Sequence, residues 1–413
     1  MANNTPLVTV IMTTYNHEKY VGEAIESVLN QTFGDIELVI VNDGSSDNTE
    51  KVIKKFTDGR IVYIYQENQG PSIAANNAIL ASRGKYIAIM SGDDVSHPLR
   101  IERQLREYQK QNNKRVLFSH CNFIDDDNNS LDGGHFAKEF FNYAAKNRFE
   151  ILNHYFWKGN FLNDITTFTE KEAFLDIGLY NPLFLQLQDF DLWMRALLKG
   201  YDFYIMPEKL ISYRIRANNA NLSAPSAEAI MRTTLENGLI LRNYLQIKTQ
   251  DDLLKIFPEV IKFNSRIEPD LIPFYIAQLS LSVPKSCHQL FGVETLFNLL
   301  NDPVLSVQLK EKVGFGHTEF CEITGRQDIF RLFHNWLSKL YVNTGNDYSE
   351  KEVVSQHINL ALGVFSLSFD LSKYSNIQSL RWDPMENQWC KVTIENMYYL
   401  DKAGNKHNID KHH

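Results

Sequence analysis

The chain has 413 residues and a formal net charge of −8, with 44% hydrophobic and 22% charged residues. This composition is typical of a soluble globular protein with two or three domains. The negative charge argues against nucleic acid as a partner and against a polybasic membrane anchor. No apolar stretch approaches the roughly 20 residues that a membrane-spanning helix needs, and the N-terminus has no signal-peptide pattern. We therefore expect a cytoplasmic protein with at most peripheral contact at the inner face of the membrane.

The cysteines support the same compartment. Cys121, Cys287, Cys321 and Cys390 lie far apart, without a CxxC pair or a spacing that suits zinc. We expect them to be reduced, mostly buried thiols of a reducing compartment.

The first hundred residues alternate between strand and helix patterns. Short apolar runs of the kind found in parallel strands buried on both faces are separated by stretches with helical periodicity. Repeated strand–helix units predict an α/β fold with a parallel, doubly wound sheet and right-handed crossovers. The predicted strands are 7–14, 37–41, 61–65 and 86–90, and the predicted helices are 18–31, one from about 49, 71–81 and 98–111.

The rest of the chain is less regular. A fifth strand at 116–124 leads into an acidic loop at 125–134, and residues 135–185 show no clear pattern. A helix at 189–198 and strands at 202–206 and 210–216 follow, before a polar, small-residue stretch at 218–226 that predicts a domain boundary. We predict three domains: an α/β domain at 1–222, a helical region at 223–345 and a small β-rich domain at 346–413, with an incomplete β-sandwich as one form it can take.

Polar residues follow three of the predicted strands. They are Thr14, Tyr15 and Asn16 after the first, Asp43 after the second, and Asp93 with Asp94 after the fourth. In an open α/β sheet, ligands bind outside the carboxyl ends of the strands. A carboxylate such as Asp43 can accept the ring N–H of uracil or thymine, with Tyr15 beside the ring. Adjacent carboxylates suit a hard divalent cation that is also bound by substrate phosphates.

Each of these residues also has a local explanation. Asp43, Asp93 and Asp94 can be turn formers or helix caps, and Tyr15 can be a packing residue. Their joint placement after three strands is what favours a nucleotide site.

Five sequence blocks give the chain a recognisable pattern. The blocks are VTVIMTTYNHEKYVGEAIESVLNQTF, ELVIVNDGSSDNT, ENQGPSIAANNAI, RGKYIAIMSGDD, and QDFDLWMRALLKGYDF with SYRIR. In this order and spacing, over about residues 5–220, they resemble the inverting glycosyltransferases of family 2. The resemblance implies a GT-A (Rossmann-like) domain. It also implies transfer of a sugar from a nucleotide diphosphate sugar to a glycan or lipid-linked saccharide in bacterial surface polysaccharide synthesis. The base-binding carboxylate favours UDP-sugars, with dTDP-sugars such as dTDP-rhamnose as the alternative.

The resemblance also implies roles for individual residues. Asp94, together with Asp93, would ligate Mn²⁺ or Mg²⁺ beside the diphosphate, and Asp93 would also contact the ribose. Asp189 stands where the family keeps its general base, although an N-cap of the helix at 189–198 is a compatible role. The donor contacts that we expect are Thr14, Tyr15, Asn16, Asp43, Asn76, Asp93 and Arg216.

The chain departs from the family pattern at four positions. Relatives often have an acid where Ser91 stands, an arginine where Ala75 stands, and an acid where Gln188 stands. They commonly have histidine where Arg216 stands, and arginine cannot ligate a metal as neutral imidazole does. Because a guanidinium can bind two phosphate oxygens, we expect Arg216 near the diphosphate.

Two other functions fit the sequence less well. A nucleotidyltransferase normally has a glycine-rich basic loop after its first strand, and here that loop is TTYNHEKY. A catalytically inactive glycan-binding or scaffold protein would have no need of a fourth carboxylate at Asp189. The tail SLRWDPMENQWCKVTIENMYYL resembles β-sandwich modules appended to some polysaccharide glycosyltransferases, where it can bind acceptor or partners, or simply stabilise the protein.

Overall fold

The computed structural model divides into two compact units, Met1–Thr324 and Gly325–His413. The predicted domain boundaries were 222/223 and 345/346, whereas the structure divides once, after Thr324. The structure describes residues 5–110, 115–131, 141–143, 145, 147–217, 220–224, 226–263, 266–330, 336–345, 347–348, 351–358, 367–383, 398–401 and 403–408.

An eight-stranded sheet with the order β3-β2-β1-β4-β7-β6-β8-β5 forms the centre of the first unit. Six strands run parallel, and the short β7 and β5 run antiparallel to their neighbours. The predicted α/β fold of GT-A type is confirmed, but the sheet is mixed. Strands of two or three residues are too short to produce a sequence pattern. The strands are β1 (Val8–Thr14), β2 (Ile36–Asp43), β3 (Ile61–Gln66), β4 (Tyr86–Ser91), β5 (Val95–Ser96), β6 (Arg115–Ile124), β7 (Phe168–Glu170) and β8 (Asp202–Arg214).

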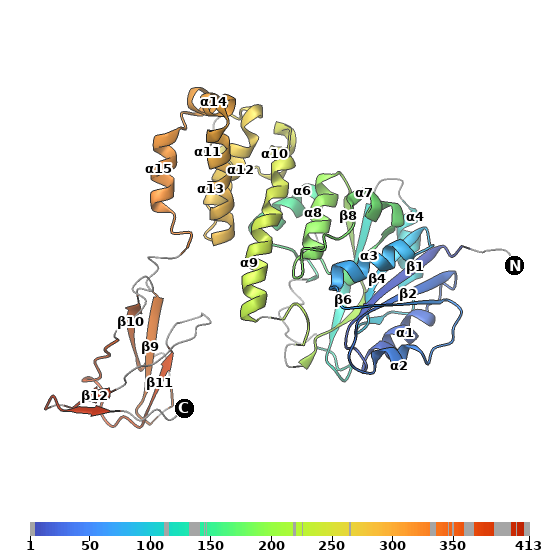
Figure 1. Cartoon of the computed structure of the whole chain (residues 1–413), viewed down its shortest axis with the longest axis horizontal. Helices are drawn as coiled ribbons and strands as arrows, with labels where there is room; N and C mark the ends of the chain where they lie inside the picture. Colours follow the sequence, from blue (N-terminus) through green and yellow to red (C-terminus); the bar gives the residue numbers. More distant parts are fainter. Residues whose placement is uncertain are drawn as a thin grey trace. The chain divides into compact units, whose positions relative to one another are not determined.

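Helices cover both faces of the sheet (Figure 1). Along β1, Val10 and Met12 contribute to one hydrophobic cluster and Ile11 contributes to the other, as the two-residue period of a strand requires. One face is covered by α1 (Val21–Leu29), α2 (Thr49–Ile53) and α4 (Arg100–Gln109), and the other by α3 (Pro71–Ala81), α6 (Arg148–Trp157), α7 (Lys171–Ile177) and α8 (Gln188–Leu198).

Two predicted element boundaries, each next to a proline, differ from those in the structure. Helix α4 begins at Arg100, and Pro98 lies in the preceding turn, where its carbonyl accepts the N–H of Thr32. The two strands predicted at 202–206 and 210–216 form the single strand β8, whose pairing with β6 is irregular next to His120. Pro207 lies in β8 and cannot donate a ladder hydrogen bond, so the sequence reads as interrupted there.

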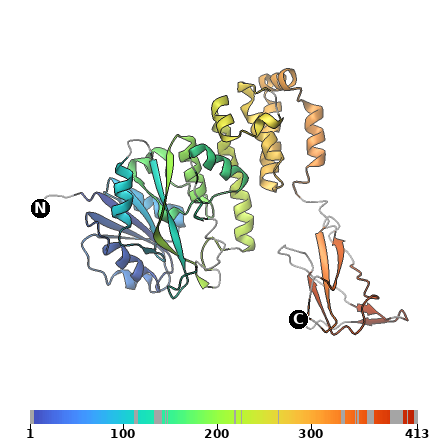
Figure 2. The same cartoon turned by 180° about the vertical axis from the view of Figure 1, so that it is seen from behind.

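The helical segment after β8 packs against α6 and α8 in one continuous core. The ring of Phe156 in α6 meets the rings of Tyr244, Phe257 and His288 edge to face. In both views α9 stands between the sheet and α13 (Figure 1 and Figure 2). The helices are α9 (Ala227–Leu241), α10 (Gln250–Ile256), α11 (Val260–Phe263), α12 (Ile272–Leu281), α13 (Ser286–Asn301), α14 (Pro303–Val313) and α15 (His317–Arg326), with 3₁₀ helices η1 (Asp164–Thr166), η3 (Arg242–Gln246) and η4 (Pro269–Leu271).

The second unit is β-rich, as predicted. It has an antiparallel sheet β10-β9-β11 and a two-stranded ribbon of β12 and β13. Much of the tail that resembles a β-sandwich module, residues 384–397, lies outside the described residues. The strands are β9 (Trp336–Asn343), β10 (Val353–Ile358), β11 (Ser379–Asp383), β12 (Tyr398–Leu400) and β13 (Lys406–Asn408).

The structure also bears on the cysteines and on membrane contact. Cys121 is buried, Cys287 is partly buried and Cys321 is exposed, and these three do not form disulfides with described residues. Cys390 lies outside the described residues. None of the described helices combines the length and hydrophobicity that crossing a bilayer requires.

Candidate active site

Hydrogen bonds join the loops after β1 and β2 at the carboxyl edge of the sheet. Asn16 has a φ of 55°, in the left-handed region that asparagine tolerates better than most residues. Its side-chain oxygen accepts the backbone N–H of Ser46 at 2.9 Å, and its own N–H donates to the Ser45 hydroxyl at 2.9 Å. Next to it the Tyr15 ring is 45% exposed, and Thr14 Oγ1 is buried without a partner among the described residues. The edge therefore presents an open aromatic face beside an unsatisfied hydroxyl.

Asp43 at the end of β2 holds the loop before α3. One carboxylate oxygen accepts from Gln66 Nε2 at 2.7 Å and from the Gln69 N–H at 2.9 Å, and the other accepts from the Gly70 N–H at 2.9 Å. A carboxylate has about four lone-pair positions. Asp43 therefore shapes this loop and keeps room for one more donor on Oδ2.

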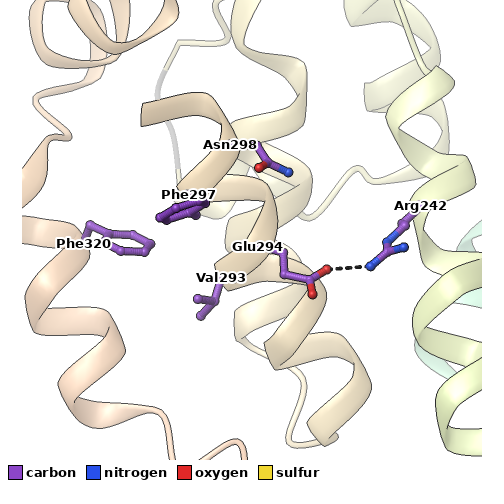
Figure 3. Close-up of a pocket in the computed structure, with 6 residues that line it drawn as sticks. All are labelled: Arg242, Val293, Glu294, Phe297, Asn298 and Phe320. Atoms are coloured by element: carbon purple, nitrogen blue, oxygen red, sulfur yellow. Dashed lines mark hydrogen bonds and ion pairs between the residues drawn. The ribbon is translucent and has the colours of Figure 1, made fainter. Parts of the chain in front are cut away.

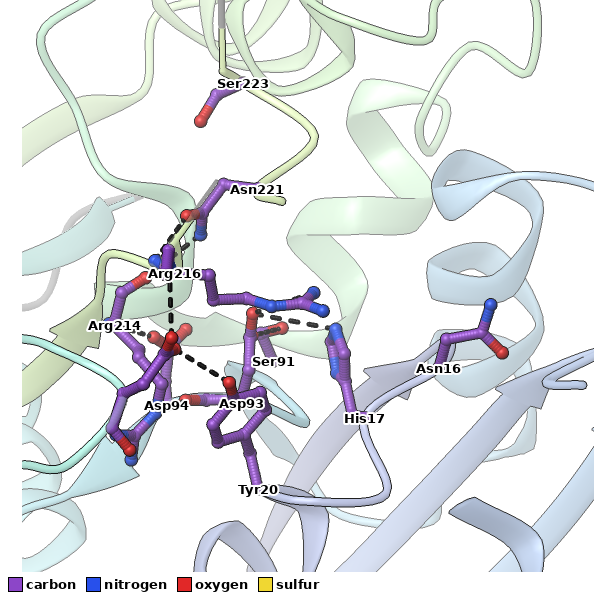
Figure 4. A network of polar contacts seen from close by, with 12 residues as sticks. Asn16, His17, Tyr20, Ser91, Asp93, Asp94, Arg214, Arg216, Asn221 and Ser223 are labelled. Carbon is purple, nitrogen blue, oxygen red and sulfur yellow. Dashed lines mark hydrogen bonds and ion pairs between the residues drawn. The ribbon is translucent and has the colours of Figure 1, made fainter. Parts of the chain in front are cut away.

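Asp93 lies at the centre of a polar network (Figure 4). Ser91 Oγ donates to Asp93 Oδ1 at 2.5 Å. On the other oxygen, Asp93 Oδ2 is 3.6 Å from His17 Nε2 and 3.9 Å from Arg216 Nη1. The turn lies close on β1 because residue 92 is glycine, and a Cβ there would be 2.6 Å from Thr14 Oγ1.

Asp94 is buried beside Asp93 and is only half satisfied. Its Oδ1 accepts the backbone N–H of Arg214 at 2.8 Å, while its Oδ2 has no partner among the described residues. Burial, and then the charge of Asp93, raise the pKa of Asp94 well above its ordinary value. A buried carboxylate oxygen without a partner is costly, and a cation is the group that would relieve that cost.

Arg214, the last residue of β8, and Arg216, two residues later, make different contacts. Arg214 is almost fully buried, and its guanidinium donates to the Asp93 carbonyl, the Asp125 carbonyl and the Glu23 carboxylate. Arg216 lies 5.5 Å from the Tyr20 ring centroid, and its Nε is buried without a partner among the described residues. Arg214 thus fixes the backbone of the site, and Arg216 keeps a donor available beside Asp93.

Asp189 lies in the first turn of α8. Asn160 Nδ2 donates to its Oδ2 at 2.8 Å. Burial raises the pKa of Asp189 to about 6, partly offset by the backbone N–H of Phe190 and by Asn160, while the charge of Glu236 raises it further. A carboxylate with this proton affinity is suited to general base chemistry near neutral pH.

Comparison with known proteins identifies the family. The sequence profile described as Glycosyl transferase family 2 matches residues 9–174. An uncharacterised glycosyltransferase of Methanocaldococcus jannaschii is 37% identical over 223 residues, which are 53% of this chain and 74% of that protein. The chain belongs to glycosyltransferase family 2.

Other relatives of this family 2 glycosyltransferase are more distant. TuaG of Bacillus subtilis, whose name assigns it to teichuronic acid biosynthesis, is 30% identical over 53% of this chain and 83% of its own length. Among solved structures, S. aureus TarS in complex with UDP has a TM-score of 0.47 at 15% identity, over 75% of this chain and 92% of that chain.

The remaining predicted donor residue, Asn76, is engaged within the glycosyltransferase itself. Its oxygen accepts the Tyr180 N–H at 2.9 Å and its Nδ2 donates to the Tyr180 carbonyl at 2.8 Å. One amide hydrogen of Asn76 remains for a ligand. Two residues depart from the family pattern near these groups. Ser91 donates a hydrogen bond to Asp93. Gln188 Oε1 is buried without a partner among the described residues.

Three residues of the site were missed by the sequence analysis. His17 lies against Asp93, and burial lowers its pKa. Glu236 in α9 accepts the backbone N–H groups of Leu185, Gln186 and Leu187 at 2.8–3.0 Å, directly before Asp189. Asp164 lies in the unassigned stretch 135–185. His17 is in the first family block and could have been selected as a titratable neighbour, but no local signal marks Glu236 or Asp164.

Cavity size does not locate this site. A cavity of about 610 Å³ is lined by Arg242 and residues of α13 and α15, and contains none of the predicted site residues (Figure 3). The site is identified instead by buried carboxylates and unpartnered polar atoms. The residues that line the cavity are Arg242, Val293, Glu294, Phe297, Asn298 and Phe320.

Proposed function

We propose that this family 2 glycosyltransferase moves a sugar, with inversion, from a nucleotide diphosphate sugar to a saccharide acceptor in bacterial surface polysaccharide synthesis. The observation that carries the proposal is the carboxyl group of Asp189, which is partly buried at the start of α8. Burial raises its pKa to about 6. A protein that only bound glycans would gain nothing from a carboxylate with this proton affinity.

The carboxyl edge of the sheet suits the nucleotide. The free lone pair on Asp43 Oδ2 would accept the ring N–H of uracil, with the exposed Tyr15 ring against the base. This favours a UDP-sugar, with a dTDP-sugar as the alternative donor. Asp93 would accept from the ribose, and Arg216 would donate its buried Nε–H to the diphosphate.

The same edge supplies some of the ligands that a divalent cation needs. Among the described residues no group of three or more acidic, histidine or cysteine side chains is arranged to bind a metal. Mg²⁺ and Mn²⁺ at phosphate sites commonly take only one or two protein carboxylates, and the unpartnered Asp94 Oδ2 fits that pattern. Asp94 and Asp93 would hold the ion, which would supply positive charge to the leaving diphosphate.

At the acceptor side, Asp189 would take the proton of the attacking hydroxyl. The bond from the acceptor oxygen to the anomeric carbon forms as the bond from that carbon to the diphosphate oxygen breaks, so one displacement inverts the configuration. General base catalysis contributes typically 10²–10⁴-fold. The acceptor would be a glycan or lipid-linked saccharide, which the similarity to TuaG supports.

A donor screen tests the proposal. Thermal unfolding is measured with UDP-sugars, dTDP-sugars and GDP-sugars, with Mn²⁺, Mg²⁺ or EDTA. We expect stabilisation by a UDP-sugar that requires the metal and is absent in Asp94→Asn. Asp270→Asn, which changes an exposed carboxylate in η4, is the matched control and should keep the stabilisation. Stabilisation by dTDP-sugars alone would select the alternative donor, and no stabilisation by any nucleotide sugar would overturn the proposal.

A further inference from the structure

Asn160 is the one side chain among the described residues that donates a hydrogen bond to Asp189. Its Nδ2 donates to Asp189 Oδ2 at 2.8 Å, and its own Oδ1 accepts the backbone N–H of Leu162 at 3.0 Å. Because a backbone donor takes the amide oxygen, the amide nitrogen must face the carboxylate. The two hydrogen bonds therefore define the orientation of the Asn160 amide.

The chain is held on both sides of Asn160. Before it, Gly159 has a φ of 102°, which glycine adopts freely, and its N–H donates to the His154 carbonyl of α6 at 3.3 Å. After it, Phe161 and Leu162 are only 1% and 3% exposed. A side chain between fixed neighbours loses less conformational entropy when it makes a hydrogen bond. Asn160 is thus in place before any substrate binds.

Asp189 has its other oxygen open to a ligand. The residue lies in the first turn of α8 and is only partly buried. In the part of the chain that the structure describes, no side chain donates to Asp189 Oδ1. A carboxyl group held through one oxygen can take a proton on the other, because the first oxygen accepts a hydrogen bond in both protonation states. This arrangement suits a base that gains and loses a proton in each cycle.

The neutral charge of the amide donor also matters. A cation in contact with a carboxylate typically lowers the carboxyl pKa by about 1–3 units, which would weaken the base. Beside the neutral amide, burial still raises the pKa of Asp189 to about 6, although the N–H of Phe190 and Asn160 lower it in part. The other titratable groups that act on Asp189 or respond to its charge contain no cation, and they are Glu236 from α9, Asp164 from η1, Tyr155 from α6 and Tyr180 after α7.

We propose that Asn160 is a positioning residue for the base: it holds Asp189 through Oδ2 so that Oδ1 faces the acceptor hydroxyl, and it stabilises the ionised carboxylate. The proposal rests on the proposed function of Asp189. In the transfer step the hydroxyl proton moves to Oδ1 as the acceptor oxygen attacks the anomeric carbon. The hydrogen bond from Asn160 to Oδ2 persists throughout.

The first test needs no substrate and uses Asn160→Ser. A serine hydroxyl can still accept the N–H of Leu162, two residues on, but it is too short to replace the amide nitrogen at Asp189. Because the folded-state pKa of Asp189 lies above its unfolded value, the ionised carboxylate destabilises the protein, and the amide relieves part of this cost above pH 6. We expect Asn160→Ser to lower the melting temperature by about 2 °C or more at pH 8, and by less at pH 5.

Two comparisons show whether this loss depends on the carboxylate. In an Asp189→Ala background no oxygen remains for the amide, so Asn160→Ser should cost little at either pH, and the two changes should be non-additive at pH 8. Asn147→Ser, at the N-cap of α6 where serine caps about equally well, is the matched control and should have the same small effect at both pH values. An equal loss at pH 8 and pH 5 in Asn160→Ser, or an undiminished loss in the Asp189→Ala background, would overturn the proposal.

The pH dependence of transfer gives a second readout. In Asn160→Ser the midpoint of the decline in kcat should move to higher pH by about half a unit to one unit, because the ionised base has lost its donor. Asn160→Asp keeps the acceptor for Leu162 and adds a like charge, so its midpoint should move further in the same direction. Donor-dependent thermal stabilisation should persist in both variants.

A loss of kcat that is equal at every pH in Asn160→Ser would indicate a merely structural role and would contradict the proposal. A failure of the proposed function has a different signature, since Asp189→Asn would then transfer at the wild-type rate. The unfolding measurements still decide in that case whether Asn160 stabilises the ionised carboxylate, because they need neither donor nor acceptor.

Discussion

Asp94 keeps one buried oxygen without a partner although its other oxygen accepts the N–H of Arg214. An ionised carboxylate in this position destabilises the protein without ligand, as polar groups at functional sites often do. Replacement by asparagine keeps the oxygen that Arg214 needs and removes the charge.

We therefore expect Asp94→Asn to unfold at the same temperature as the wild type or higher at pH 7.5, while losing metal-dependent donor binding. Differential scanning fluorimetry with and without donor and Mn²⁺ measures both effects. A lower melting temperature of the ligand-free variant would contradict a purely functional role for this oxygen.

For Asp189 the expected effect is on rate rather than on donor binding. Asp189→Asn keeps the acceptor for Asn160 but removes the base, so transfer should fall by about 10²–10⁴-fold. Donor-dependent thermal stabilisation should remain. Transfer assayed with radiolabelled donor checks the rate, and a variant with more than a tenth of wild-type turnover would exclude Asp189 as the base.

The pH dependence of the wild type follows from the same group. Because burial holds the pKa of Asp189 at about 6, the base is protonated, and transfer should decline, as the pH falls below about 6. A pH–rate profile of kcat at saturating donor measures this decline. Full activity retained down to pH 4.5 would show that the essential base has an ordinary carboxylate pKa.

At the scale of elements, α9 contacts the segment before the proposed base, Asp189, through Glu236. This carboxylate accepts three consecutive backbone N–H groups at 185–187, just before α8 begins. The helix thereby fixes the segment that sets the position of Asp189. Glutamine can accept with only one of its two terminal atoms, so Glu236→Gln would leave backbone N–H groups unpaired.

We expect Glu236→Gln to lower both melting temperature and kcat while leaving donor stabilisation intact. Each unpaired N–H costs about 1–3 kcal/mol. Glu294→Gln, which breaks an exposed ion pair with Arg242, is the matched control and should change stability by less than about 1 kcal/mol. Equal effects of the two variants, measured by thermal unfolding and by transfer rate, would contradict the special role of Glu236.

At the scale of the whole molecule, the helices after β8 complete the core of the sheet-containing part. Tyr244 donates to the Leu152 carbonyl at 2.6 Å, and His288 Nε2 is 2.8 Å from the Phe156 carbonyl. Both contacts fall on α6, whose buried residues belong to the same hydrophobic cluster as those of the later helices.

We expect residues 1–324 to fold cooperatively and keep donor-dependent stabilisation, and residues 1–222 to aggregate or unfold without a transition. Circular dichroism melting of both truncated chains tests this. A cooperative transition for residues 1–222 would show that α6 and α8 need no cover from the later helices.

The sequence predicted the parts of the fold that follow from repeated local patterns. The strands β1 to β4 and their helices were found within a few residues because apolar runs and helical stripes are local. The short β5 and β7 were missed, since two or three residues set no period. At the site, Asp93, Asp94 and Arg216 were expected together and lie together, because strand ends meet at one edge. Asp164 and Glu236 could not be found, because each owes its position to tertiary contacts.

The three hydrogen bonds that residues 185–187 donate to Glu236 limit where such enzymes can be recombined. The apparent module boundary in the 218–226 stretch is not a neutral point for recombination. A chimaera that joined this sheet domain to the helices of a distant relative would keep the segment that carries the proposed base but lose the carboxylate that holds it. Exchanges between such enzymes should therefore keep residues 185–189 and α9 from the same parent.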